Sequence, residues 1–246
     1  MRRSRITFLA ALIVAVIAIA GFIIWAETPL PAMPEAIVAL NSDSHVQVNS
    51  SRWLVFQSLG EQRPIGFIFY PGGRVDPRAY APPVRQIAEE GYLSVIVPMP
   101  LNLAVLAPDS ASEVIKAYPE IHTWIIGGHS LGGSMAAQFV YNHPLVVKGL
   151  VLWASYPPSG NNLTAYDLKV VSIYGVLDGV LNFGDLEASR SLLPPDTTWI
   201  AIQGGNHAQF GWYGPQPGDN SASISRESQQ SQAVQVVLIL IDEVAG

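Results

Sequence analysis

The stretch Thr123–Gly132 reads Thr-Trp-Ile-Ile-Gly-Gly-His-Ser-Leu-Gly, and it decides the fold. Its start, Thr123–Ile126, has the composition of a buried strand, and residues 131–142 behind it repeat apolar side chains at helical spacing. Between them, residues 128–132 have the form G-x-S-x-G. The two glycines permit a tight turn, so the Ser130 hydroxyl is exposed at a helix N-terminus, where free N–H groups favour a developing anion. We therefore predict that Ser130 is a nucleophile.

Outward from this stretch, short apolar runs alternate with helical patterns. Strands are expected at residues 65–70, 93–97, 123–126, 149–153, 170–174 and 198–202, after an antiparallel pair at 46–48 and 52–57. Helices are expected at residues 77–90, 111–118, 131–142, 186–193 and 228–244. Continuous apolar strands separated by helices favour a mostly parallel sheet that is covered on both faces. We expect a three-layer α/β domain with its chemistry at the carboxyl ends of the strands.

A nucleophilic serine needs a general base, which an acidic side chain orients. His207 follows the last expected strand, where a loop can return to the edge that carries Ser130. The other four histidines lie upstream of Ser130, inside its motif, or at the end of the following helix; they are His45, His122, His129 and His143. His207 is therefore the predicted base.

The acidic partner is expected between Ser130 and His207, just after a strand. Asp178 meets this condition, because it comes four residues after the expected strand 170–174. The competing carboxylates precede that strand, open the next helix or lie in a turn; they are Asp167, Asp185, Glu187 and Asp196. We predict Asp178 as the third member of a triad.

Two backbone N–H groups are needed to hold the oxyanion of a tetrahedral intermediate. The N–H of Leu131, directly after the nucleophile, is one. The loop after the strand 65–70, Pro71-Gly72-Gly73-Arg74, supplies the other, because its glycines allow a close approach of the backbone. We predict Gly73 as this donor, with Arg74 as the alternative.

Apolar residues near these positions are candidates for a substrate pocket. Residues 98–106 follow a strand end, and Phe210, Trp212 and Tyr213 follow His207. We predict Leu101 and Trp212 as substrate-binding residues; ordinary loop packing is the alternative. The sequence contains no phosphate-binding loop, dinucleotide fingerprint or metal-ligand cluster, so no cofactor and no metal are expected.

The N-terminus carries a separate signal. Residues 6–25 are uncharged and would span about 30 Å as a helix, and Arg2, Arg3 and Arg5 precede them. This pattern predicts a transmembrane helix with its N-terminus in the cytoplasm and the rest of the chain outside. A signal peptide cut after Ala20 or Ala26 is the alternative, which would give a secreted protein. The predicted domains are 1–25, a proline-rich linker 26–35, and a catalytic domain 36–246.

The composition narrows the function classes. Of the 246 residues, 49% are hydrophobic and 13% are charged, which excludes a disordered chain. The absence of cysteine excludes a cysteine nucleophile and a disulfide scaffold. The formal charge is −6, and three of the 13 basic residues but none of the 19 acidic ones precede the apolar run, so the remainder carries −9. This acidic balance argues against nucleic acid as a partner.

These residues together resemble a known family. Gly128-His129-Ser130-Leu131-Gly132, Gly175-x-x-Asp178-Gly179 and Gly205-Asn206-His207 are similar to motifs of the α/β-hydrolase superfamily, above all its small bacterial members near the dienelactone hydrolases. The resemblance covers the chain from Ile65 to its end. It implies an α/β-hydrolase fold and an esterase-like serine hydrolase with Ser130, Asp178 and His207 as its triad.

The chain departs from that pattern at two places. Dienelactone hydrolases use a cysteine nucleophile, and this chain has none. Pro71 stands where many lipases have a histidine before the oxyanion glycines. The expected function is hydrolysis of carboxylic esters with small hydrophobic acyl groups. A thioesterase, a peptidase-type acyl hydrolase and a non-catalytic, membrane-tethered binding module are the alternatives.

Overall fold

The core of the protein is an eight-stranded sheet, seen in a computed structural model that describes the backbone of residues 2–245 and the side chains of residues 11–245. The strands lie in the order β1-β2-β4-β3-β5-β6-β7-β8. Their bounds are β1 Val46–Asn49, β2 Leu54–Ser58, β3 Arg63–Tyr70, β4 Tyr92–Ile96, β5 Thr123–His129, β6 Gly149–Trp153, β7 Lys169–Gly175 and β8 Thr198–Ile202. Every expected strand is confirmed, and β5 runs three residues further than its apolar stretch indicates.

The sheet is mostly parallel, as the alternation of strands and helices predicts. Strand β1 pairs antiparallel with β2, and β2 pairs antiparallel with β4. All pairings from β4 through β3, β5, β6 and β7 to β8 are parallel. The carboxyl ends of β3, β5, β7 and β8 therefore meet at one edge, which brings together the loops that carry the predicted chemistry.

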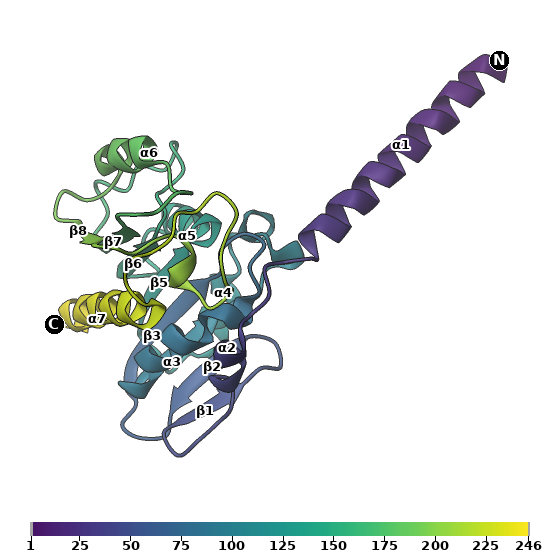
Figure 1. Ribbon diagram of the computed structural model, residues 1–246. Coiled ribbons are helices and arrows are strands. Elements are labelled where there is room, and N and C mark those ends of the chain that lie inside the picture. The colour runs from purple at the N-terminus through teal and green to yellow at the C-terminus, as the bar shows by residue number, and fades with distance from the viewer. Residues whose placement is uncertain (1, 246) are drawn as a thin grey trace.

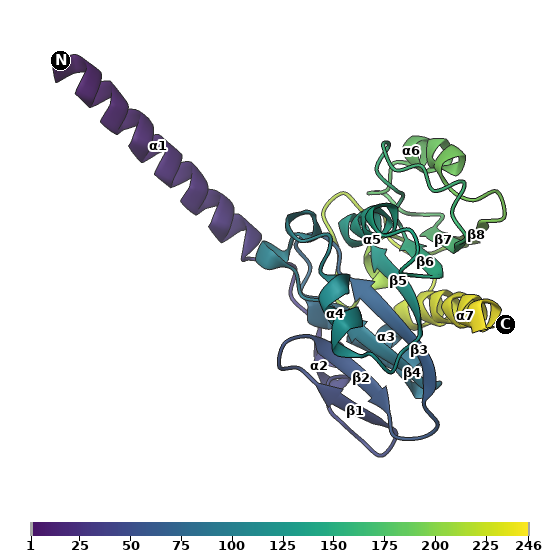
Figure 2. The same cartoon turned by 180° about the vertical axis from the view of Figure 1, so that it is seen from behind.

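Helices cover both faces of the sheet (Figures 1 and 2). Successive side chains of a strand point to opposite faces, so Phe67 and Phe69 pack in one core with helices α3 (Ala81–Glu89) and α7 (Arg226–Ala245). Ile68 and Tyr70 pack in the other core with α4 (Ala111–Ala117) and α5 (Leu131–Asn142). The three layers are those expected from strands that are apolar on both sides.

The remaining elements are short. Helix α6 (Phe183–Ala188) continues into a 3₁₀ turn, η4 (Ser189–Leu192), so it begins three residues before the expected start at Leu186. The reason is Asn182, whose side chain accepts the N–H groups of Gly184 and Asp185 and caps the helix. Helix α2 (Pro34–Val38), which the sequence analysis did not predict, starts at a proline. Further 3₁₀ turns are η1 Pro77–Tyr80, η2 Pro100–Asn102, η3 Ala104–Leu106 and η5 Ala208–Phe210.

The N-terminal helix α1 (Arg2–Ala26) extends away from the domain (Figures 1 and 2). Where the structure describes side chains, no helix is both long enough and apolar enough to cross a membrane. The predicted transmembrane helix is thus not supported by the structure.

The segment after α1 is extended, as its prolines favour, but it is docked on the domain. The N–H of Leu30 donates to the carbonyl of Arg74 at 2.8 Å, and the N–H of Asp76 donates back to Leu30 at 3.0 Å. Further along, the N–H of Met33 donates to the carbonyl of Trp212 at 2.8 Å. These bonds join residues 26–35 to the edge where the functional loops meet. The division into residues 1–25, 26–35 and 36–246 stays a prediction.

Candidate active site

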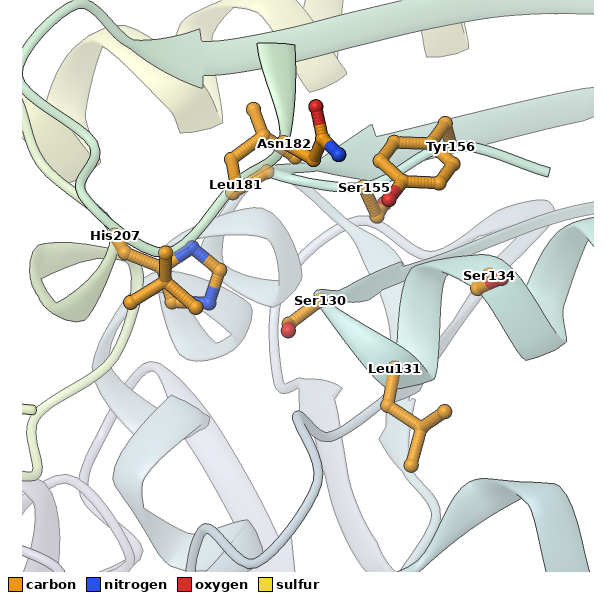
Figure 3. A pocket seen from close by; sticks show the side chains of 10 residues that line it. Ser130, Leu131, Ser134, Ser155, Tyr156, Leu181, Asn182 and His207 are labelled. Carbon is orange, nitrogen blue, oxygen red and sulfur yellow. The ribbon is translucent and has the colours of Figure 1, made fainter. Parts of the chain in front are cut away.

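Ser130 occupies the turn between β5 and α5. Its backbone has φ 52° and ψ −122°, a left-handed conformation that side-chain-bearing residues rarely adopt. Its N–H donates to the carbonyl of Trp153 on β6 at 2.9 Å, which ties the turn to the neighbouring strand. The strained turn lifts the Ser130 side chain out of the sheet and into a pocket (Figure 3).

The glycines on either side of Ser130 are required by close packing. A Cβ on Gly128 would lie 2.5 Å from the carbonyl carbon of Gly132. A Cβ on Gly132 would lie 2.1 Å from the carbonyl oxygen of Tyr70, at the end of β3. No side chain fits at either position, which explains why the motif needs glycine there.

Asp178 and His207 form a buried pair. Oδ2 of Asp178 lies 2.8 Å from Nδ1 of His207, and both side chains are almost fully shielded from solvent. Oδ1 of the same carboxylate accepts the N–H groups of Val180 at 2.8 Å and Leu181 at 2.7 Å. Because the backbone holds one carboxylate oxygen, the other is fixed toward the imidazole. Nδ1 then carries the proton, and Nε2 keeps a lone pair.

His207 and Ser130 face one pocket from opposite loops (Figure 3). Nε2 of His207 is buried and has no hydrogen-bond partner within the described part of the chain, the Ser130 hydroxyl included. A catalytic hydrogen bond is often long without substrate and tightens when substrate binds. The arrangement leaves Nε2 available to accept the Ser130 proton.

Asp219 links the two loops that carry this pair. Its Oδ1 accepts the N–H of Gly179 at 2.9 Å, next to Asp178, and the N–H of His207 at 3.3 Å. Its Oδ2 accepts the N–H of Ala208 at 2.8 Å. The carboxylate of Asp219 therefore fixes the loop that carries Asp178 relative to the loop that carries His207. Asp219 lies twelve residues beyond His207 in a loop without a recognisable motif, so no sequence pattern points to it.

A second buried pair, Tyr80 and His129, lies beneath the site. The Tyr80 hydroxyl accepts the N–H of Gly72 at 3.1 Å and lies 2.8 Å from Nδ1 of His129. Burial, and then the neighbouring His207, lower the pKa of His129 well below its usual value, so its imidazole is neutral. We assign the hydroxyl proton to the bond with Nδ1, since the hydroxyl already accepts from Gly72. The ring centroids of His129 and His207 are 4.5 Å apart, so the buried imidazole of His129 packs against the ring of the predicted base.

The two predicted oxyanion donors lie against each other. A Cβ on Gly73 would lie 3.0 Å from Cδ2 of Leu131, so the loop after β3 rests on the start of α5. The N–H of Arg74, the alternative donor, already donates to the carbonyl of Asn102 at 2.8 Å. Among the described residues the N–H of Gly73 has no such partner. This favours Gly73 over Arg74, and the assignment remains a proposal.

Two cavities adjoin Ser130, and they have only Ser130 and Leu131 in common. The first, about 270 Å³ and here called the His207 cavity, is lined by Ser130, Leu131, Ser134, Ala154, Ser155, Tyr156, Val180, Leu181, Asn182 and His207. The second, about 440 Å³ and here called the Trp25 cavity, is lined by Trp25, Leu30, Gly73, Arg74, Leu103, Ser130, Leu131, Gln216 and Pro217. The nucleophile thus stands between two separate spaces.

The predicted substrate-binding residues lie elsewhere. Neither Leu101 nor Trp212 lines a cavity beside Ser130 in the described structure. Trp212 is buried, and its indole N–H donates to the side chain of Gln230 at 2.7 Å, which turns the ring toward α7. Leu101 has φ 52° in the turn η2, and two residues later Leu103 reaches the Trp25 cavity instead.

The described residues contain no cluster of three or more histidine, cysteine, aspartate or glutamate side chains that could hold a metal ion.

Comparison with known proteins identifies the relatives of this architecture. A family model described as "Alpha/beta hydrolase family" matches residues 66–231. The solved α/β hydrolase MGS-MChE2, from the metagenome of lagoon sediments at Mar Chica, Morocco, is 16% identical, with a TM-score of 0.60 over 82% of this chain and 100% of that one. Propionate-bound Est2, an esterase from the Planctomycetes species Thermogutta terrifontis, is 11% identical, with a TM-score of 0.57 over 82% of this chain and 94% of that one. Est1E from Butyrivibrio proteoclasticus is 12% identical, with a TM-score of 0.54 over 81% and 100%. No curated protein matches this sequence.

Proposed function

The chain belongs to the alpha/beta hydrolase family, which confirms the superfamily resemblance noted in its motifs, and from this premise we propose that it is a serine hydrolase that cleaves carboxylic esters. The observation that carries the proposal is the buried pair of Asp178 and His207, 2.8 Å apart, with the unpartnered Nε2 of His207 facing Ser130 across one pocket. A base held in this way is what a serine hydroxyl needs to become a nucleophile.

The first half of the proposed reaction acylates the enzyme. Nε2 of His207 takes the proton of the Ser130 hydroxyl as the oxygen attacks the ester carbonyl carbon. Asp178 keeps the imidazole in the correct tautomer and stabilises the cation that forms. The N–H groups of Leu131 and Gly73 hold the negative oxygen of the tetrahedral intermediate. When the intermediate collapses, His207 gives its proton to the leaving alkoxide, and an alcohol departs.

The second half returns the enzyme to its starting state. A water molecule enters the place of the alcohol, and His207 takes one of its protons as the water oxygen attacks the acyl carbon. The same two N–H groups hold the second tetrahedral intermediate. On collapse the proton passes to the Ser130 oxygen, and a carboxylic acid is released. The proposed substrates are esters with small hydrophobic acyl groups, and no cofactor takes part.

A panel of p-nitrophenyl esters, with acyl thioesters and p-nitroanilides of the same acids, tests this proposal. The wild type is expected to hydrolyse the esters fastest, and Ser130→Ala to lose activity on every substrate. Ser112→Ala, an exposed serine on α4, is the matched control and is expected to keep full activity. Undiminished turnover by Ser130→Ala would refute the proposal. Faster turnover of thioesters or anilides would make the enzyme a thioesterase or a peptidase-type hydrolase instead.

We also propose, from the sequence alone, that the catalytic domain works outside the cytoplasm. The support is the uncharged run at residues 6–25 behind Arg2, Arg3 and Arg5. Protease treatment of intact cells, combined with mass spectrometry of the protein's N-terminus, tests this location and separates a retained from a cleaved N-terminal segment. Protection of the domain until the cells are lysed would contradict it.

A further inference from the structure

The two cavities beside Ser130 are lined by different residues. The wall of the His207 cavity mixes polar side chains, among them Ser134, Tyr156 and Asn182, with aliphatic ones. The Trp25 cavity is bounded mainly by apolar groups, which come from Trp25, Leu30, Leu103 and Leu131. An ester has two halves that meet at the carbonyl carbon, so each cavity can take one of them.

The positions of the catalytic groups decide which half goes where. The leaving alcohol must lie beside Nε2 of His207 to receive its proton, and of the two cavities His207 lines only the His207 cavity. The carbonyl oxygen must lie at the N–H groups of Leu131 and Gly73, and Gly73 lines only the Trp25 cavity. The alcohol half therefore occupies the His207 cavity, and the acyl half extends past Gly73 into the Trp25 cavity.

We propose that the Trp25 cavity is the acyl-binding site and that the substrates are esters of apolar carboxylic acids of medium chain length. This inference rests on the proposed function and adds to it the part of the substrate that the enzyme selects. A cavity of about 440 Å³ lies within the usual range of small-molecule sites and exceeds the needs of an acetyl group. Burial of each additional methylene group against the apolar wall favours binding of the longer chain.

The single cation in the wall of this cavity, among the residues described, is already engaged. Nε of Arg74 donates to the carbonyl of Trp25 at 2.8 Å, and Nη2 donates to the carbonyl of Thr28 at 2.8 Å. Its guanidinium also stacks on the indole of Trp25, with Cζ 4.2 Å from the ring centroid. These contacts occupy Nε and Nη2 of Arg74 and anchor its guanidinium to the end of α1 at the wall of the site.

The wall contributed by Trp25 is fixed in place. Ala26 is fully buried, and its carbonyl accepts the side-chain N–H of Asn102 at 3.0 Å. The carbonyl of Leu30 accepts the N–H of Asp76, as described above, so the chain on both sides of Thr28 is tied to the catalytic domain. The end of α1 is therefore part of the substrate site, and a chain cut after Ala26 would lack the indole wall.

Acyl-chain selectivity tests the assignment. The measurement is kcat/KM of the full chain for p-nitrophenyl acetate, butyrate, hexanoate and octanoate. Trp25→Ala is expected to lower the ratio of hexanoate to acetate by about tenfold, because a few apolar contacts are lost only with the longer chain. Trp53→Ala is the matched control, since Arg52 stacks on Trp53 in the same manner at 4.5 Å, and Trp53 lines neither cavity beside Ser130. It is expected to keep the wild-type ratio.

A filling variant gives the opposite test. Leu103→Phe places a larger side chain in the cavity and is expected to lower the ratio of octanoate to acetate turnover. Wild-type selectivity in both Trp25→Ala and Leu103→Phe, with esters still hydrolysed, would overturn the acyl-site assignment alone. Failure of the wild type to hydrolyse any of the four esters, together with no labelling of Ser130 by a fluorophosphonate, would overturn the proposed function as well.

Discussion

The hydroxyl oxygen of Tyr80 lies 2.8 Å from Nδ1 of His129, and both side chains are fully buried. The same hydroxyl accepts the N–H of Gly72 at 3.1 Å. One phenol thus joins the loop that carries Gly73 to the residue directly before Ser130. A Cβ on Gly72 would lie 2.7 Å from this hydroxyl, so the loop can approach it only with glycine at that position. We infer that Tyr80 positions the oxyanion loop against the nucleophile.

Tyr80→Phe is expected to lower kcat for p-nitrophenyl esters by about 10- to 100-fold with little change in KM, because a displaced oxyanion donor weakens the transition state more than the bound substrate. Tyr70→Phe is the matched control. The Tyr70 hydroxyl is also bonded inside the protein, to the carbonyl of Pro108 and the N–H of Ala111, but these partners lie before and at the start of α4 and not in the oxyanion loop. Both variants are expected to lose about 1–3 kcal/mol of stability. An equal fall of kcat in the two would show that Tyr80 acts through stability alone.

The burial of His129 is expected to make the free energy of unfolding depend on pH. Burial holds its pKa well below the value of 6.5 in the unfolded chain, so the folded protein keeps it neutral while the unfolded protein binds a proton. Its contribution is therefore fully present above pH 6.5 and is lost as the pH falls from 6.5 toward the lower pKa of the folded state. Thermal melts at a series of pH values from 7.5 to 5 measure the effect.

His129→Gln is expected to flatten this fall in Tm between pH 7.5 and 5, whatever its stability at neutral pH. His45→Gln is the control, because the side chain of His45 is 79% exposed, and it is expected to keep the wild-type slope. If the slope of His129→Gln equals that of the wild type, the buried imidazole is not the titrating group.

Asp219 is expected to be a positioning residue for the base. Asp219→Ala removes the acceptor of the N–H groups of Gly179, His207 and Ala208, so kcat should fall by about tenfold or more while binding of substrate changes little. Asp219→Asn keeps a carbonyl oxygen that can accept some of these bonds, and should recover part of the activity. The readouts are kcat and KM from initial rates over a range of ester concentrations, and circular dichroism checks that the variants are folded. A normal kcat in Asp219→Ala would contradict this role.

Asp178→Asn tests the choice of the acid. An amide in place of the carboxylate cannot fix the required tautomer of His207, so kcat should fall by roughly 10³- to 10⁴-fold. Asp185→Asn is the control at a competing position in the same interval of the sequence. There the carboxylate is exposed and accepts the hydroxyl of Tyr156 at 3.1 Å, and its loss is expected to change kcat by less than about threefold. The reverse order of effects would reassign the acid.

Much of the fold follows from local pattern. Most positions in the strands from β3 to β8 are apolar, and this pattern favoured a sheet covered on both faces. Chain order after Ser130 then selected Asp178 and His207, and the structure brings these two side chains together. The end of β5 was less clear, because Gly127 and Gly128 interrupt the apolar run although the strand continues through them to His129.

The parts that were not predicted depend on contacts between distant segments. Trp25 reaches Arg74 across 49 residues, and Tyr80 reaches His129 across the same span, so no periodic pattern records either contact. Leu103 rather than Leu101 lines the Trp25 cavity, and Leu101 and Asn102 both have positive φ in that turn, which no sequence pattern records; the role of Leu101 in substrate binding stays a prediction. Trp212 follows the catalytic histidine closely in sequence, yet its indole N–H finds its acceptor on α7.

The central claim is that Ser130 is the nucleophile and His207 its base. Labelling of the full chain with a fluorophosphonate probe, followed by mass spectrometry of its peptides, tests this claim most directly. We expect one label per chain on Ser130, no label on Ser130→Ala, and labelling of His207→Ala that is slower by orders of magnitude. A label on another residue, or stoichiometric labelling of Ser130→Ala, would contradict it.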